Sequence, residues 1–324
     1  MRRIGLAGAS LFAISTMAIA GTPTPTEGIH HDWYAPRAAA FAVASAALTP
    51  AVQALCEATP SQADVSLQQA RRHWLDVLAA WERLAGVAIG PVLERRAQRQ
   101  IDFTPTRPRM IEKAIQAAPT TPADMELIGT PAKGLPALEW LLWVKPVAPG
   151  TSACRYAVQV AQEIGHEAEA LTAEKPAAVD DSAALSELVN QWVGGLERLR
   201  WPGMEMPARV ALTGGTPGQP DYPRRDSGAA AIAWAAQWDA LRALATQGVS
   251  ALTARLRARG HAALADALSA DITAADSLMR DLAAADTGRV LAAARSLAGL
   301  KKRVEAEVAP ALGVSIGFSD ADGD

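Results

Sequence analysis

Cysteine and aromatic residues are scarce in this chain of 324 residues, which contains two cysteines and 5% aromatic residues. This composition excludes a disulfide-rich scaffold, and the two cysteines do not form the CxxC pair of redox or zinc motifs. The HExxH signature of zinc peptidases is also missing, because His166-Glu167 is followed by Ala170 where the second histidine is required. Neither sign of charge dominates: 31 Lys and Arg residues oppose 34 Asp and Glu residues, which argues against nucleic acid as a partner.

The residue types that are abundant favour helices over sheets. Hydrophobic residues make up 50% of the chain and alanine is frequent, whereas Tyr and Phe number only 3 and 4. Alanine has the highest helix propensity, and aromatic and β-branched residues are the ones that strands prefer. We therefore predict an all-α protein made of two packed helical-bundle domains, with about ten helices in all.

The first twenty residues have the pattern of a secretory signal peptide. Arg2 and Arg3 form a positive start, an uncharged apolar run follows, and Ala18-Ile19-Ala20 matches a small-x-small cleavage site. A membrane anchor is the alternative, although the apolar run is short for a spanning helix. No cysteine lies at the cleavage point, so the chain does not have the sequence of a lipoprotein. We expect a soluble protein that is exported to the periplasm.

Export bears on Cys56 and Cys154, the only two cysteines. An oxidising compartment lets them form a disulfide if their Cα atoms come within about 7 Å. The alternative is two separate buried thiols, because free cysteine is among the most frequently buried residue types.

Apolar periodicity and Pro/Gly breaks define the helices and domains. The clearest stripe is formed by Trp74, Val77, Leu78, Trp81 and Leu84, which recur at helical spacing. The predicted helices are residues 35–57, 62–88, 91–100, 107–118, 135–144, 152–173, 181–200, 227–246, 249–259, 261–285 and 287–308. Residues 29–175 form the predicted N-terminal bundle and residues 176–324 the C-terminal bundle, with a long loop at 201–225 and a non-helical tail at 310–324.

The segment with the most chemical content is residues 129–143. Pro136 suits the first turn of a helix, and Glu139 is the only ionisable residue between Leu135 and Val144. An acid among apolar neighbours is expected to be buried and to need a partner or a proton. Glu139 could complement the helix dipole or pair with a core arginine, or it could act as a ligand or acid–base carboxylate in a cleft between the bundles.

Other arrangements of metal-ligand residue types carry less weight. His166 and Glu169 share a helix face, but a solvated surface is the more common role of such a pair. His30, His31 and Asp32 lie near the mature N-terminus, and the ending Asp320-Ala-Asp-Gly-Asp324 stops before a calcium loop could be complete. Five aspartates from Asp266 to Asp286 recur every five residues, which spirals them around a helix, so we expect them to be solubilising.

Four separated segments resemble the imelysin family of bacterial envelope proteins. They are residues 74–92 with the Gly90-Pro91 break, residues 134–143, the Arg225-Asp-Ser-Gly228 helix start, and the ending at residues 312–324. The resemblance implies two α-helical bundles, export, and a site between the domains. It also implies a history of proposed peptidase activity and an association with iron uptake.

One position departs from the family motif GxHxxE. Gly134 and Glu139 match it, but Pro136 stands at the histidine position and offers no imidazole lone pair. We therefore favour a non-catalytic periplasmic binding or accessory protein linked to iron or metal acquisition, with an envelope iron-uptake component as its expected partner. The candidate site residues are Lys133, Gly134, Glu139, Arg225 and Ser227, with Glu139 as a carboxylate ligand for iron or another divalent or trivalent metal.

Two alternatives stay open. A metal-dependent envelope peptidase would need a histidine from elsewhere, His166 or His73. A purely structural interaction protein is expected if Glu139 is fully paired with an arginine and no cleft opens beside it.

Overall fold

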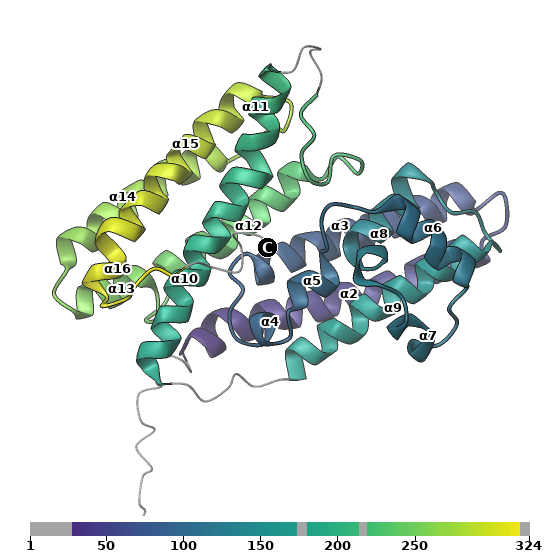
Figure 1. Ribbon diagram of the computed structural model, residues 1–324, viewed down its shortest axis with the longest axis horizontal. Helices are drawn as coiled ribbons and strands as arrows, with labels where there is room; N and C mark the ends of the chain where they lie inside the picture. The colour runs from purple at the N-terminus through teal and green to yellow at the C-terminus, as the bar shows by residue number, and fades with distance from the viewer. Residues whose placement is uncertain (1–27, 174–179, 214–218, 318–324) are drawn as a thin grey trace, which may run out of the picture.

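The computed structural model describes residues 28–173, 180–213 and 219–317, and this part of the chain is helical without any β-strand. The all-α prediction is confirmed. The predicted signal peptide and the acidic end of the tail lie outside the described residues. In Figure 1 the helices form two groups, one from the N-terminal half and one from the C-terminal half, that pack against each other. The domain boundary at residue 175 remains a prediction.

Three long helices form the framework of the N-terminal group. They are α2 (Ala35–Glu57), α3 (Ala63–Ala85) and α9 (Ser152–Ala173), with α2 packed between the other two. Shorter elements connect α3 to α9: α4 (Pro91–Glu94), α5 (Ala97–Ile101), α6 (Pro108–Ala117), α7 (Pro122–Glu126), η2 (Thr130–Ala132), α8 (Gly134–Glu139) and η3 (Trp140–Val144). The short π-helical segment η1 (His30–Tyr34) precedes α2.

The predicted stripe of α3 is the centre of this core. All five of its residues are at most 1% exposed, as the helical spacing predicts. Among the described residues, the stretch His30–Glu57 is the one that is long and apolar enough to cross a membrane. Its side chains Phe41, Leu48, Val52 and Leu55 are buried against α3 and α9, while 28% of its most apolar window as a whole is buried.

The C-terminal group is built on α10 (Asp181–Arg200), α12 (Ala230–Thr246), α14 (Ala262–Met279) and α15 (Thr287–Arg303). The remaining elements are η4 (Trp201–Glu205), α11 (Met206–Thr213), α13 (Leu252–Ala258), η5 (Val304–Val308) and α16 (Ala309–Ala311). The predicted helix at 261–285 ends at Met279, because Arg280 is extended and Asp281 is left-handed with φ of 52°.

The prediction of a loop at residues 201–225 is wrong for its first half. Residues 201–213 continue α10 as η4 and α11. Pro202 and Pro207 lie inside this continuous helix. The π-helical turn η4 accommodates their missing N–H groups, and the carbonyl oxygen of Gly203, four residues before Pro207, accepts from Nε1 of Trp234 instead. Glu205 accepts from Arg200 and from Arg209 and fixes the junction.

The two groups meet where α3, α10 and α12 come together. A Cβ added to Gly195 of α10 would lie 2.0 Å from the carbonyl oxygen of Gly86, and one added to Gly86 would lie 2.8 Å from Cβ of Ala240. Only glycine permits so close a backbone approach. Trp33 and Trp192 donate to the carbonyl oxygens of Ala240 and Leu241 and add polar anchors to the junction.

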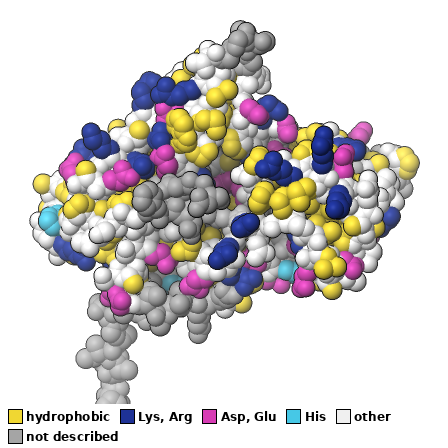
Figure 2. All heavy atoms as spheres, in the orientation of Figure 1, with side chains coloured by type: hydrophobic (Ala, Val, Ile, Leu, Met, Phe, Trp, Pro, Cys, Tyr) yellow, Lys and Arg dark blue, Asp and Glu magenta, His cyan; other side chains and the backbone are white. Residues whose placement is uncertain are grey.

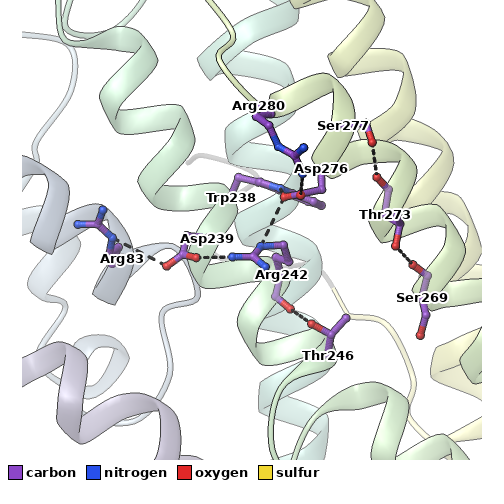
Figure 3. Close-up of polar contacts among 10 residues, drawn as sticks. All are labelled: Arg83, Trp238, Asp239, Arg242, Thr246, Ser269, Thr273, Asp276, Ser277 and Arg280. Atoms are coloured by element: carbon purple, nitrogen blue, oxygen red, sulfur yellow. Dashed lines mark hydrogen bonds and ion pairs between the residues drawn. The ribbon is translucent and has the colours of Figure 1, made fainter.

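A chain of ion pairs crosses the outer side of this junction (Figure 3). Asp239 of α12 pairs with Arg83 of α3 and with Arg242, and Arg242 reaches Asp276 of α14. Asp276 also accepts from Nε1 of Trp238 at 3.0 Å. The expectation that Asp276 is merely solubilising is therefore wrong: α12 brings an indole N–H to it, which the helix period alone does not reveal.

Cys56 and Cys154 form a disulfide, with their Cα atoms 5.5 Å apart. The bond joins the last turn of α2 to the first turn of α9. The sequence leaves open a disulfide or two separate buried thiols, and the structure contains the disulfide.

Candidate functional site

The start of α8 is fixed by a glycine. Gly134 has φ of +70°, and a Cβ there would lie 2.3 Å from the carbonyl oxygen of Ile101. The residue therefore has to be glycine on both conformational and steric grounds. Pro136 follows in the first turn, and the side chain of Glu139 emerges one turn later at the end of α8.

Glu139 is buried, with 6% of its surface exposed, and both carboxylate oxygens have protein partners. Oε1 accepts from the backbone N–H of Ser227 at 3.0 Å and from its Oγ at 2.6 Å. Oε2 lies 3.5 Å from Nη1 of Arg224. The expected need for a partner is met by one arginine and one serine, both from the segment that leads into α12.

Arg224 is the centre of an ion-pair cluster with Glu139 and Asp102. Its second amino group, Nη2, donates to Asp102, which follows α5. Burial opposes the charge of this guanidinium, but the attraction of Asp102, Glu139 and Glu82 outweighs it and leaves the pKa of Arg224 above its ordinary value. The residue is thus a permanent cation inside the protein, 5.8 Å from the centre of the Trp74 ring.

Of the other predicted site residues, Ser227 contacts Glu139, whereas Arg225 and Lys133 lie apart from it. Arg225 is exposed and pairs with Asp221 and Asp226. Its neighbour Arg224, and not Arg225, lies next to Glu139, and it has a left-handed backbone conformation with φ of 66°. Lys133 points to Glu163 of α9, 3.1 Å away. Of the five candidates, the structure brings Glu139 and Ser227 into direct contact, and Gly134 begins the helix that contains Glu139.

A pocket of about 170 Å³ opens beside the ion-pair cluster, and we call it the central pocket. Its ionisable lining residues are Glu82, Asp102, Arg198 and Arg224, and its wall also contains Trp81, Ala85, Gln98, Pro202, Gly203, Ala233, Trp234 and Gln237. These residues come from α3, the segment around α5, α10, η4, the segment that leads into α12, and α12 itself. Figure 2 shows this face of the molecule hollowed near its centre, with hydrophobic and basic side chains on both sides of the recess.

Glu82 has the most perturbed environment in the central pocket. Burial and, to a smaller extent, the charge of Asp102 raise its pKa to about 7, although Arg224 and Arg198 act in the opposite direction. Within the described part of the chain its carboxyl group has no hydrogen-bond or salt-bridge partner. A carboxyl group that is half protonated near neutral pH and unpartnered is ready to bind a ligand or exchange a proton.

Arg198 faces the same pocket from α10. Its Nη2 donates to the carbonyl oxygens of Ala85 and Gly86, at 2.7 and 3.3 Å, where α3 ends. Burial lowers the pKa of Arg198, and Glu82 and Asp102 raise it. Among the described residues, Nη2 is the only one of its nitrogen atoms that donates a hydrogen bond to the protein.

Sequence reasoning missed Glu82, Asp102, Arg198 and Arg224. A weak signal existed for Glu82, because it directly follows Trp81 of the buried α3 stripe. The sequence contains no comparable signal for Asp102 and Arg198, because their place in the pocket depends on contacts between segments about a hundred residues apart.

The residues present do not fit the metal centre that a GxHxxE motif would provide. Pro136 contributes no ligand atom, and both oxygens of Glu139 are engaged by N–H and O–H donors. In the described ranges, no three or more His, Cys, Asp or Glu side chains are grouped to hold a metal ion. His166 is exposed on α9, and His73 lies 4.0 Å from Asp76 on α3.

Fold and site together define an all-α, two-bundle protein with a buried carboxylate–arginine cluster beside a pocket. The Imelysin family model, of the M75 peptidases, matches residues 34–310, and the chain belongs to this family. The structure resembles an imelysin-like protein from Psychrobacter arcticum 273-4, with a TM-score of 0.73, 20% identity, and coverage of 90% of this chain and 95% of that one.

A second similar structure is a proposed iron-regulated protein A precursor from Parabacteroides distasonis ATCC 8503. The TM-score is 0.67 at 13% identity, with 88% of this chain and 95% of that chain covered. At these identities the likeness shows the shared fold. No curated protein matches the chain significantly.

Proposed function

We propose that this protein is a non-catalytic binding or accessory protein of the bacterial periplasm, linked to iron acquisition, and that the central pocket is its ligand site. The observation that carries the proposal is the pair of ionisable groups, Glu82 and Arg198, that face the pocket without a salt bridge among the described residues. A protein that only needed stability would gain from replacing such groups with apolar ones. Their presence at the junction of two bundles is typical of a binding site.

The alternative, a metal-dependent envelope peptidase, has less support. A catalytic metal needs protein ligands and an open coordination position. Glu139 is committed to Ser227 and Arg224, and its carboxylate positions the segment that leads into α12. The histidines that could compensate, His73 and His166, lie on α3 and α9, and His166 faces solvent.

Two further observations support the cellular role. Residues 1–20 have the sequence of a signal peptide, which directs a protein out of the cytoplasm. One structural relative is named as iron-regulated. An envelope iron-uptake component is the partner that this role implies.

The test is to identify what the protein carries when it is purified from the periplasm. Compounds released by heat are measured by mass spectrometry and metals by plasma mass spectrometry, for the wild type and for Ala233→Leu. Ala233 lines the pocket, so a leucine there fills it. The matched control is Ala235→Leu, an exposed position on the same helix.

We expect the wild type and the control to release the same compound and Ala233→Leu to lack it. The proposal is contradicted if the wild type carries nothing, or if Ala233→Leu carries as much as the control. Hydrolysis of a peptide substrate that a chelator stops would favour the peptidase instead.

A further inference from the structure

The side chains of Glu82 and Arg198 have opposite charges and both face the central pocket, yet they do not form an ion pair with each other. Glu82 and Arg198 interact through their charges, but within the described residues no hydrogen bond or salt bridge joins them. The guanidinium uses Nη2 for two backbone carbonyl oxygens, and its Nε and Nη1 remain without a protein partner. The carboxyl oxygens of Glu82 likewise lack donors.

The other charges of the pocket are already balanced. Arg224 pairs with Asp102 on one side and with Glu139 on the other. Asp102, Arg224 and Arg198 are the charged groups that act on Glu82. The pocket thus offers one free acceptor and one free set of donors, held apart on α3 and α10.

A ligand that complements Arg198 and Glu82 needs one negative and one positive group. A guanidinium with free N–H groups in a partly buried site binds a carboxylate through charge-assisted hydrogen bonds. An ionised carboxylate in the same site binds an ammonium group, and both interactions are stronger there than in water because the surroundings are less polarisable.

The size of the pocket limits the ligand. A cavity of roughly 150 Å³ accommodates benzene, and the central pocket is slightly larger at about 170 Å³. A ligand of about six to ten non-hydrogen atoms therefore fits. Trp81, Trp234 and Ala85 in the wall suit a short hydrocarbon segment between two charged ends.

We infer that the central pocket binds a small zwitterion of the amino-acid class, with the ligand carboxylate on Arg198 and the ligand ammonium on Glu82. The inference rests on the proposed function, because it names the ligand class of the same pocket.

The experiment is calorimetric titration of the purified, dialysed protein with glycine, β-alanine and 4-aminobutanoate. These probes vary the spacing between the two charges. Acetate and methylammonium are titrated in parallel at the same ionic strength, because each carries only one charge. We expect at least one zwitterion to bind at least about tenfold more tightly than either single-charge probe, corresponding to one decade in Kd.

The affinity of the wild-type protein for zwitterions should depend on pH, and this test needs no variant. An ammonium group requires ionised Glu82, and with a pKa of about 7 the ionised fraction rises by about tenfold between pH 6 and pH 8. The zwitterion affinity should rise by a similar factor. An anion alone would show the opposite trend, because it is repelled when Glu82 ionises.

Glu82→Gln should weaken zwitterion binding at pH 8 by at least about tenfold, whereas Asp76→Asn, an exposed carboxyl on the same helix, should leave it unchanged. Acetate that binds as tightly as any zwitterion, and more tightly at pH 6 than at pH 8, would overturn the zwitterion assignment and keep the pocket as a ligand site. No binding of any probe would also overturn the assignment. The proposed function is then decided separately by the compound released from the wild type and missing from Ala233→Leu.

Discussion

Replacing Glu82 with glutamine should stabilise the unliganded protein, and by an amount that depends on pH. The carboxyl has a pKa of about 7 in the folded protein and 4.5 in the unfolded chain, mainly because burial disfavours its charge. An acid with a raised folded-state pKa stabilises the folded state only while it is protonated there. Its contribution is fully present below pH 4.5 and is lost as the pH rises through 7.

The magnitude follows from the two ionisation constants. Each tenfold change in an ionisation constant corresponds to about 1.4 kcal/mol, so an ionised Glu82 costs the folded state up to about 3 kcal/mol above pH 7. Glutamine has nearly the same shape and never ionises. The stability gained by Glu82→Gln over the wild type should therefore grow by about 2.5 kcal/mol between pH 5 and pH 8.

The assay is urea unfolding followed by circular dichroism at pH 5, 6, 7 and 8, with the disulfide intact. Asp76→Asn serves as the control, because Asp76 is an exposed carboxyl on the same helix, and its difference from the wild type should stay nearly constant over this range. A difference for Glu82→Gln that does not change with pH would refute the raised pKa. A difference that shrinks as the pH rises would mean that ionised Glu82 has a strong partner.

Two more predictions concern the framework. Removing the disulfide by Cys56→Ala with Cys154→Ala should lower the free energy of unfolding by up to about 4–5 kcal/mol, because the bond closes a loop of roughly 100 residues; denaturant titration with and without reductant checks this, and an unchanged midpoint would contradict it. Gly195→Ala should cost about 3 kcal/mol or fail to fold, because its Cβ would overlap the Gly86 carbonyl oxygen. Gly165→Ala is the matched helical glycine with no atom within 4 Å of its Cβ, and it should be neutral or stabilising by up to about 1 kcal/mol; equal melting temperatures for the two variants would be the contrary result.

Features encoded by local periodicity could be predicted from the sequence. The α3 stripe from Trp74 to Leu84 is buried as its spacing requires, because a helix places residues three and four apart on one face. The burial of Glu139 followed in the same way from its apolar neighbours. Both inferences need only the residues within a few turns of one helix.

The central pocket could not be predicted because its groups come from distant segments. Glu82, Asp102 and Arg198 approach one another only once α3 has packed against α10. Arg224 was missed by a single position, since its left-handed backbone turns it inward and leaves Arg225 outside. The two prolines between residues 201 and 213 favour a loop by composition, whereas in the structure they lie inside one helix, where the π-helical turn η4 and the hydrogen bond from Trp234 to the Gly203 carbonyl oxygen accommodate them.

The contacts of Glu139 explain how its position can matter when Pro136 stands at the histidine position of the motif. Its carboxylate accepts two hydrogen bonds from Ser227 and shares Arg224 with Asp102, so its removal would leave a buried guanidinium with one carboxylate fewer and an N–H of Ser227 without its acceptor. None of these interactions involves position 136. The glutamate therefore has a structural role that does not depend on a metal, and that role orders Arg224 in the wall of the central pocket.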